Sequence, residues 1–169
     1  MRNLLIGIDS GTQSTKALVV DAKSGKVLGE AAQAYDLLPN LPAGAKEQQP
    51  ETWREAAARC IKQALKTAKA QAAEVRAIGI SGQQHGFVPL DKQGAVIRPA
   101  KLWCDTATAA ECEEITAALG GAKNTIKVLG NAVLPGFTAS KIKWLKNNEP
   151  KNFKKLATVL LPHDYLNHW

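Results

Sequence analysis

A polar turn between two apolar runs holds the first residues that could do chemistry. Residues 4–8 are too short and too apolar for a surface helix and predict a buried strand, and residues 15–20 predict a second strand. The turn and its flanks carry a carboxylate, a glycine, two hydroxyls and an amine: Asp9, Gly11, Thr12, Ser14 and Lys16. The glycine permits a left-handed turn and a close approach to the backbone, and the hydroxyls and the amine can bind a phosphate. An acid beside a phosphate is expected where Mg²⁺ lies between the two.

The turn by itself has two explanations. Asp, Ser, Gly and Thr are also ordinary turn residues, so a plain hairpin accounts for them equally well. The spacing matches neither G-x-x-x-x-G-K-[ST] nor G-x-G-x-x-G, which excludes those two nucleotide-binding classes. The order Asp-x-Gly-Thr within a hairpin resembles the first phosphate loop of the superfamily that contains sugar kinases, Hsp70 and actin.

Two further polar clusters lie later in the chain. Residues 83–85 (Gln-Gln-His) follow the apolar run 75–81, and residues 103–105 (Trp-Cys-Asp) precede a predicted helix. Amide, imidazole and carboxylate groups suit the hydroxyls of a sugar or polyol, and an indole suits its apolar face. Structural explanations stay open for the same residues: His85 bonded to a backbone carbonyl, Trp103 as a buried anchor and Asp105 as a helix cap.

Two other kinds of site are excluded by the same sequence. The three histidines are isolated at positions 85, 163 and 168, which gives no plausible ligand set for a metal. The chain also lacks the G-x-S-x-G elbow, so a Ser-His-Asp triad has no support.

Short strands and one long helix must position these groups. Three consecutive predicted strands, 4–8, 15–20 and 26–34, indicate an antiparallel meander. The next helix is expected to begin at Thr52, because Thr52 and Glu55 have capping-box spacing, and to pack its apolar stripe on the sheet. A returning strand at 75–81 then predicts an α/β fold whose mixed sheet opens with the meander and has helices on both faces.

The second half is expected to be mainly helical. Thr108 and Glu111 have capping-box spacing for a helix over about 107–119, and Thr138 can cap a helix that ends before Pro150. An apolar run at 159–161 predicts a further strand, and residues 164–169 indicate the start of a helix.

Composition narrows the class of protein. A length of 169 residues fits one domain or a piece of one, and an apolar fraction of 45% suits a globular core. No apolar stretch is long enough for a membrane span, and no leader precedes the first strand, so no membrane partner is expected. The three cysteines lack metal-type spacing and are expected to be free thiols, which favours a reducing, cytoplasmic location.

The net charge of +7 is concentrated near the C-terminus. The lysines that crowd the last third are Lys123, Lys127, Lys141, Lys143, Lys146, Lys151, Lys154 and Lys155. They are interleaved with apolar residues at helical spacing and include no arginine, so a solvated helix face is favoured over a nucleic-acid interface. No nucleic-acid partner is therefore expected.

Five ordered motifs make a family resemblance specific. They are residues 8–12 (Ile-Asp-Ser-Gly-Thr), 82–86 (Gly-Gln-Gln-His-Gly), 102–105 (Leu-Trp-Cys-Asp), 134–139 (Leu-Pro-Gly-Phe-Thr-Ala) and 160–165 (Leu-Leu-Pro-His-Asp-Tyr). Their order and spacing resemble those of the FGGY carbohydrate kinases along the whole chain. The resemblance implies a ribonuclease-H-like, actin-like ATPase domain. It further implies that residues 1–169 form the N-terminal sugar-kinase domain, incomplete at its C-terminus, and that the C-terminal nucleotide-binding domain is absent.

The resemblance also implies roles for individual residues. Asp9 is expected to orient Mg²⁺ through water. The residues expected to face the transferred phosphate of ATP are Gly11, Thr12, Gln13, Ser14 and Lys16. The residues expected to bind the sugar are Gln84, His85, Trp103 and Asp105.

The pair at positions 84 and 85 also bears on the substrate. Glycerol kinases of the family carry Arg-Glu there, so Gln84 and His85 favour a ketopentose, D-xylulose, phosphorylated on its 5-hydroxyl. Cys104 departs from the family, where an asparagine often precedes Asp105. The general base, an Asp, is expected beyond Trp169, so the isolated chain is predicted to be inactive.

Two alternatives stay open. Another sugar or polyol kinase of the family, acting on ribulose or glycerol, would carry the same motifs. A sugar-binding or scaffold domain without catalysis would keep the fold alone. The sequence leaves the oligomeric state undetermined, with a homodimer as one alternative.

Overall fold

The structure, a computed structural model, describes residues 2–169, which form two compact units. The first unit contains residues 2–37, 50–83 and 162–169. The second contains residues 38–49 and 84–161.

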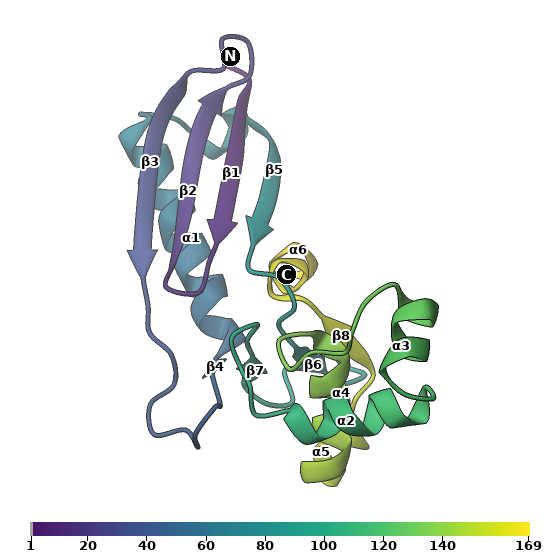
Figure 1. The fold of residues 1–169 in the computed structure, drawn as a ribbon. Coiled ribbons are helices and arrows are strands. Elements are labelled where there is room, and N and C mark those ends of the chain that lie inside the picture. Colours follow the sequence, from purple (N-terminus) through teal and green to yellow (C-terminus); the bar gives the residue numbers. More distant parts are fainter. Residues whose placement is uncertain (1) are drawn as a thin grey trace. The chain divides into compact units, whose positions relative to one another are not determined.

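A four-stranded sheet forms the centre of the first unit (Figure 1). Its strands are β1 (Leu4–Ser10), β2 (Ser14–Asp21), β3 (Val27–Ala34) and β5 (Val75–Gly82), in the spatial order β3-β2-β1-β5. The first three are antiparallel neighbours, and β5 pairs parallel with β1. The predicted meander and mixed sheet are confirmed.

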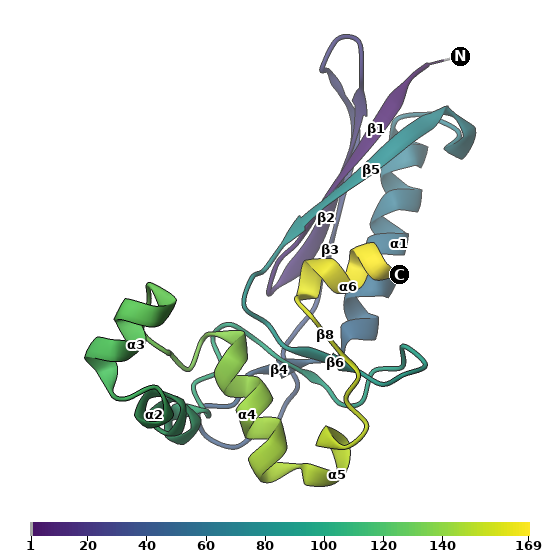
Figure 2. The same ribbon diagram turned by 90° about the vertical axis from the view of Figure 1, so that its right-hand side faces the viewer.

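Helix α1 (Pro50–Thr67) covers one face of this sheet. Alternate residues of β1 and β2 point into the core that the sheet shares with the helix. The strands contribute Leu4, Ile6, Ile8, Ala17 and Val19, and the helix and the residue just after it contribute Cys60, Ala64 and Ala68. Figure 2 shows α6 (Pro162–His168) on the same side of the sheet as α1. The opposite face leaves Leu5 and Leu18 exposed, so the helices of the first unit cover one face of its sheet, whereas both faces were expected to be covered.

A glycine lets α1 approach β3 closely. A Cβ atom on Gly29 would lie 2.4 Å from the carbonyl oxygen of Ala64 and 2.7 Å from the amide nitrogen of Ala68. Neither backbone atom can move away without disrupting the helix. The tight contact between helix and sheet therefore requires glycine at this position.

The expected start of α1 at Thr52 is wrong, because the helix begins at Pro50. Proline suits the first turn of a helix, since its fixed φ is already helical and its missing N–H would have no partner there. Thr52 therefore lies inside the first turn, where its spacing to Glu55 has no capping role. A short 3₁₀ helix, η1 (Ala72–Glu74), leads into β5.

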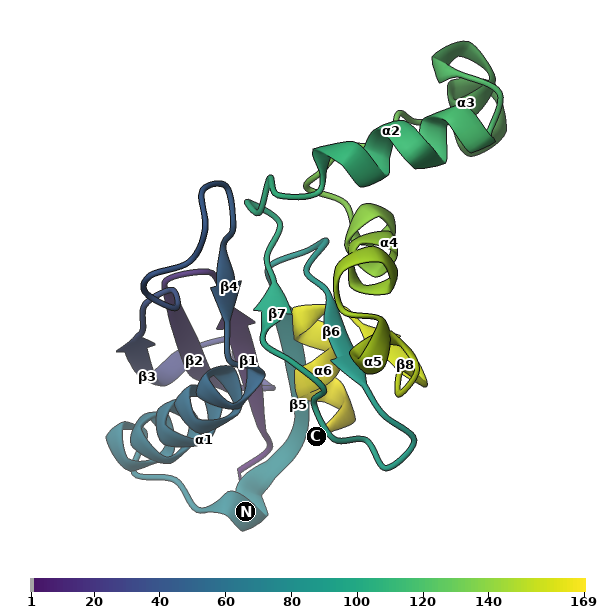
Figure 3. The ribbon, with the colours of Figure 1, turned by 90° about the horizontal axis from the view of Figure 1, so that it is seen from below.

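The second unit combines two small antiparallel strand pairs with four helices. Strand β4 (Glu47–Gln48) pairs with β7 (Ala100–Lys101), and β6 (Val88–Leu90) pairs with β8 (Thr158–Leu160). The helices are α2 (Ala109–Ala118), α3 (Ala122–Leu129), α4 (Thr138–Asn148) and α5 (Pro150–Phe153). Figure 3 shows α4 and α5 beside β6 and β8. Among residues 2–169, no helix is both long and apolar enough to cross a bilayer.

Three details of this unit differ from the sequence predictions. Helix α3 was not predicted, and its apolar residues Ile126, Val128 and Leu129 are exposed. Thr108 and Thr138 stand at the starts of α2 and α4, but their hydroxyls bond elsewhere instead of capping these helices.

Candidate functional site

Residues 11–13 form the turn between β1 and β2, and it is a tight one. The amide of Gly11 donates to the carbonyl of Ser14 at 2.9 Å. Gly11 is not among the glycines with positive φ, so it does not use the left-handed conformation that glycine permits. A Cβ atom at this position would meet the Ser14 carbonyl oxygen at 3.5 Å, an ordinary contact. Neither its backbone conformation nor its neighbours in the fold therefore require glycine at position 11.

A cluster of hydroxyls lies behind this turn. The Tyr35 hydroxyl donates to the carbonyl of Gly11 at 2.8 Å and lies 3.0 Å from Oγ1 of Thr15. The Ser10 hydroxyl is 3.2 Å from that of Thr15. Because the single proton of Tyr35 goes to Gly11, the Thr15 hydroxyl donates to Tyr35. Burial raises the pKa of Tyr35 above its usual value, so it remains a donor at neutral pH.

Gln83 holds the turn from the neighbouring strand. Its backbone amide donates to the carbonyl of Ser10 at 2.9 Å. Its side-chain amide donates to the carbonyl of Gly11 at 3.4 Å and accepts a hydrogen bond from the Thr12 hydroxyl at 3.2 Å. The turn is thus fixed at its start and middle by two residues. The sequence prediction had not singled out Tyr35, and it had grouped Gln83 with the polar cluster 83–85 instead of with this turn.

The charged residues of the turn lie on the open face of the sheet. Asp9 is the register partner of Lys16 on β2 and of Ser81 on β5, so the three side chains form one row across the strands. Asp9, Lys16 and Ser81 are exposed. They line a hollow of about 610 Å³ whose floor includes Gly7 and Gly79, which also pair in register. A carboxylate, an amine and a hydroxyl thus meet beside the turn.

Mg²⁺ fits the donor set at this end of the sheet. Among residues 2–169 no group of three or more His, Cys, Asp or Glu is placed to hold a metal. Mg²⁺ does not need one, since it is commonly held by one or two carboxylates together with substrate phosphates and water. The exposed carboxylate of Asp9 provides such a ligand.

The second unit brings His85 and Trp103 together. Phe87 forms an antiparallel bridge with Lys101, and its amide donates to the Lys101 carbonyl at 2.8 Å. His85 precedes this bridge by two residues and Trp103 follows it by two, and the segment Gly136–Phe137 lies against the backbone of Trp103 and the ring of His85. The Phe137 ring adds to this group, with its centroid 4.8 Å from that of His85.

The side chains of this group face solvent. Gln84 and His85 are exposed, and 52% of the Trp103 surface is accessible. Imidazole, amide and exposed indole groups are a combination that binds the hydroxyls and the apolar face of a sugar. We refer to Gln84, His85, Trp103 and Phe137 as the sugar cluster.

Asp105 does not join the sugar cluster. Its carboxylate is fully buried and accepts hydrogen bonds from the Lys101 amine at 3.0 Å and from the backbone amides of Lys46 at 2.9 Å and Ala107 at 3.1 Å. These bonds occupy both oxygens. The prediction that Asp105 lines the sugar pocket is therefore not supported by the geometry, and its visible role is to hold the chain that carries Trp103.

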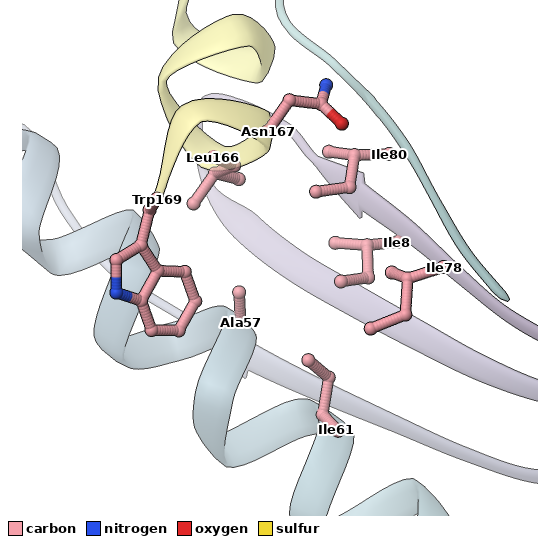
Figure 4. Close-up of a pocket in the computed structure, with 8 residues that line it drawn as sticks. All are labelled: Ile8, Ala57, Ile61, Ile78, Ile80, Leu166, Asn167 and Trp169. Atoms are coloured by element: carbon pink, nitrogen blue, oxygen red, sulfur yellow. The ribbon is translucent and has the colours of Figure 1, made fainter. Parts of the chain in front are cut away.

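A second hollow, between α1, α6 and the sheet, is chemically different (Figure 4). It has a volume of about 430 Å³ and is lined by Ile8, Ala57, Ile61, Ile78, Ile80, Leu166, Asn167 and Trp169. None of these side chains is charged, so it offers no counter-charge for a phosphate.

Comparisons with known proteins identify the family of this chain. Residues 4–169 match the model of the FGGY family of carbohydrate kinases, N-terminal domain. The xylulose kinase of Haemophilus influenzae is 44% identical over 98% of this chain and 34% of its own length. The xylulose kinase of Bacillus subtilis is 39% identical over 96% of this chain and 32% of its own. The chain thus spans about one third of the length of these curated relatives.

A solved structure gives the same result. The crystal structure of a "xyloylose kinase" from Brucella ovis superposes with a TM-score of 0.89 at 35% identity, over 99% of this chain and 34% of the other. This likeness confirms the expected actin-like, ribonuclease-H-like fold, and the family match covers nearly the whole sequence. The chain therefore belongs to the FGGY family of carbohydrate kinases, as part of that family's N-terminal domain.

Proposed function

We propose that this chain is the N-terminal part of an ATP-dependent D-xylulose kinase. The reaction joins the 5-hydroxyl oxygen of the sugar to the γ-phosphorus, breaks the bond between that phosphorus and the bridging oxygen of ADP, and gives D-xylulose 5-phosphate. The hydroxyl proton passes to a general base, which we place outside these 169 residues together with the nucleotide-binding domain. The isolated chain would then be inactive, since a missing base alone costs about 10²–10⁴-fold in rate.

In this proposal the chain positions the sugar and the phosphate. Gln84, His85 and Trp103 bind the sugar. Gly11, Thr12, Gln13 and Ser14 face the transferred phosphate, with Gly11 leaving room for it beside the backbone, and Lys16 contributes positive charge. Mg²⁺, when bound, neutralises charge on the phosphates, and Asp9 would hold it through water.

One observation carries the phosphate assignment. Gly11 stands at the centre of a turn held by Tyr35 and Gln83, yet nothing in the fold requires glycine there. The close approach of a ligand to the backbone is the remaining physical reason for a residue without a side chain. The names of the relatives and the Gln84-His85 pair support D-xylulose as the sugar.

A substrate comparison tests the choice of sugar. An intact kinase that carries this domain is assayed by ADP release with D-xylulose, D-ribulose and glycerol at saturating ATP. We expect kcat/KM to be highest for D-xylulose, by about tenfold or more, because a site built for particular hydroxyls leaves polar groups unpaired with another substrate. A clear preference for ribulose or glycerol would show that Gln84 and His85 were misinterpreted.

A pair of glycine substitutions tests the phosphate turn. In the same intact kinase, Gly11→Ala is expected to leave thermal unfolding unchanged and to lower kcat by about 10²-fold, because a methyl group displaces the phosphate from the backbone. Gly29→Ala is the control, since its Cβ would collide with the Ala64 carbonyl. It is expected to destabilise the domain by about 1–3 kcal/mol. Wild-type kcat in Gly11→Ala would remove the phosphate turn from the proposal.

A further inference from the structure

His85 has an unusual backbone conformation. Its φ is +57°, in the left-handed region that residues with a side chain rarely adopt. Such a conformation is unfavourable for a residue with a side chain and persists only where its surroundings enforce it. The conformation also sets the direction in which the imidazole leaves the backbone.

The first turn of α4 supplies the groups that enforce it. The carbonyl oxygen of His85 accepts a hydrogen bond from the Lys141 amine at 2.9 Å and another from the Thr138 hydroxyl at 3.3 Å. Phe137, immediately before the helix, places its ring against the imidazole at an interplanar angle of 48°. Three contacts from residues 137–141, at the start of α4, therefore hold the backbone and the ring of His85.

Lys141 also reaches the segment that carries Trp103. Its amine donates a second hydrogen bond to the carbonyl of Gly136. Gly136 in turn lies so close to Trp103 that a Cβ atom on it would be 2.8 Å from the Trp103 carbonyl oxygen. One amine thus links the backbone of His85 to the loop that packs against Trp103.

The burial of Lys141 is costly. The residue has no accessible surface, which overturns the expectation that it lies on a solvated helix face. Desolvation lowers its pKa to about 8, against a smaller opposing effect of the Asp105 charge, so it stays mainly protonated at pH 7. A methionine would occupy a similar volume without placing a charge in the interior. The visible return for burying this charge is the pair of hydrogen bonds to the carbonyls of His85 and Gly136, both of which belong to the segments around the sugar cluster.

We propose that Lys141 is a positioning residue for sugar recognition, which holds His85 in its left-handed conformation and keeps the Gly136–Phe137 loop against Trp103. The sugar cluster presents its imidazole and indole in a fixed relation because both backbones are tied to one buried amine. The proposal rests on the proposed function, since it concerns the same sugar site.

The test compares two lysines of α4 in the intact kinase. Lys141→Met removes the amine and keeps most of the side-chain volume. We expect it to raise the KM for D-xylulose by about 10–100-fold, as for lost charge-assisted hydrogen bonds, and to leave the KM for ATP unchanged. Lys143→Met is the control, because Lys143 is partly exposed and pairs with Glu114 at 2.8 Å. It is expected to change neither KM.

A second variant keeps the test decisive if Lys141→Met does not fold. Thr138→Val removes only the hydroxyl that donates to His85, and is expected to raise the KM for D-xylulose by about 3–10-fold without affecting that for ATP. Unchanged sugar KM values in the folded variants would overturn the positioning role and leave Lys141 a structural residue. Failure of the proposed function is seen separately, as wild-type preference for another substrate. In that case the KM of each variant is compared with the wild-type KM for the preferred substrate.

Discussion

Replacing Asp105 with alanine is expected to lower the free energy of unfolding by about 3–5 kcal/mol, the cost of removing one partner from a buried ion pair. The Lys101 amine, 1% exposed, lies 3.0 Å from Asp105 and 3.1 Å from Glu47. Without Asp105 it keeps one carboxylate, together with the ring of Trp144 4.1 Å away. The amides of Lys46 and Ala107 lose their acceptor at the same time.

The measurement is urea denaturation of this chain, with Glu114→Ala as the matched control. Glu114 also pairs with a lysine, Lys143, at 2.8 Å, but half of its side chain is exposed. Its removal is expected to leave the midpoint nearly unchanged, because solvent and salt screen exposed pairs. Amide hydrogen exchange locates the effect, since the amides of Lys46 and Ala107 should lose protection in Asp105→Ala and keep it in the control.

The opposite result would restore the role that the family resemblance implied. If Asp105→Ala unfolds at the wild-type urea concentration, and in an intact kinase raises the KM for D-xylulose, the carboxylate contacts the sugar. The buried arrangement would then be incorrect. The two roles are separable because one predicts a change in stability and the other a change in substrate binding.

Much of the fold could be predicted from the sequence because its signals are local. The apolar runs at 4–8 and 75–81 predicted strands, and both strands were found. The expected burial is only partly correct, because β1 is buried on one face and β5 has no fully buried residue. Helix starts were less predictable. The spacing of Thr52 and Glu55 is that of a capping box, but it occurs equally inside a helix that begins at Pro50. Helix α3 was missed because it is only eight residues long and lies between Gly121 and Gly130, although its apolar residues are spaced as in a helix.

The site was predictable where it depends on neighbouring residues and not where it depends on distant ones. The polar turn can be predicted from the eight consecutive residues Asp9 to Lys16. The bonds that hold it come from Tyr35 and Gln83, which are distant in sequence. Lys141 resembles its lysine neighbours in sequence, and only its hydrogen bond to a carbonyl 56 residues away separates it from them.

Asp9→Asn is expected to reduce kcat of an intact kinase by about 10²–10³-fold while the protein folds normally. Asp9 is exposed at the end of β1 beside the proposed phosphate turn, and in the proposed function its negative charge holds the Mg²⁺ ion of ATP through water. Asparagine keeps the size and the hydrogen-bonding oxygen but removes that charge. The Mg²⁺ concentration for half-maximal activity should therefore rise by about tenfold or more, with little change in the KM for D-xylulose.

Glu30→Gln provides the control for Asp9→Asn. Glu30 is an exposed carboxylate on β3 of the same sheet and pairs in register with Leu18, away from the turn. Its replacement removes the same charge from the same unit and should change neither kcat nor the Mg²⁺ dependence, because its field is screened by solvent. If both variants keep wild-type kcat and Mg²⁺ dependence, Asp9 does not hold the metal. If both lose activity to the same extent, the effect is one of overall charge. A loss confined to Asp9→Asn assigns the metal-binding carboxylate to the first strand of the domain.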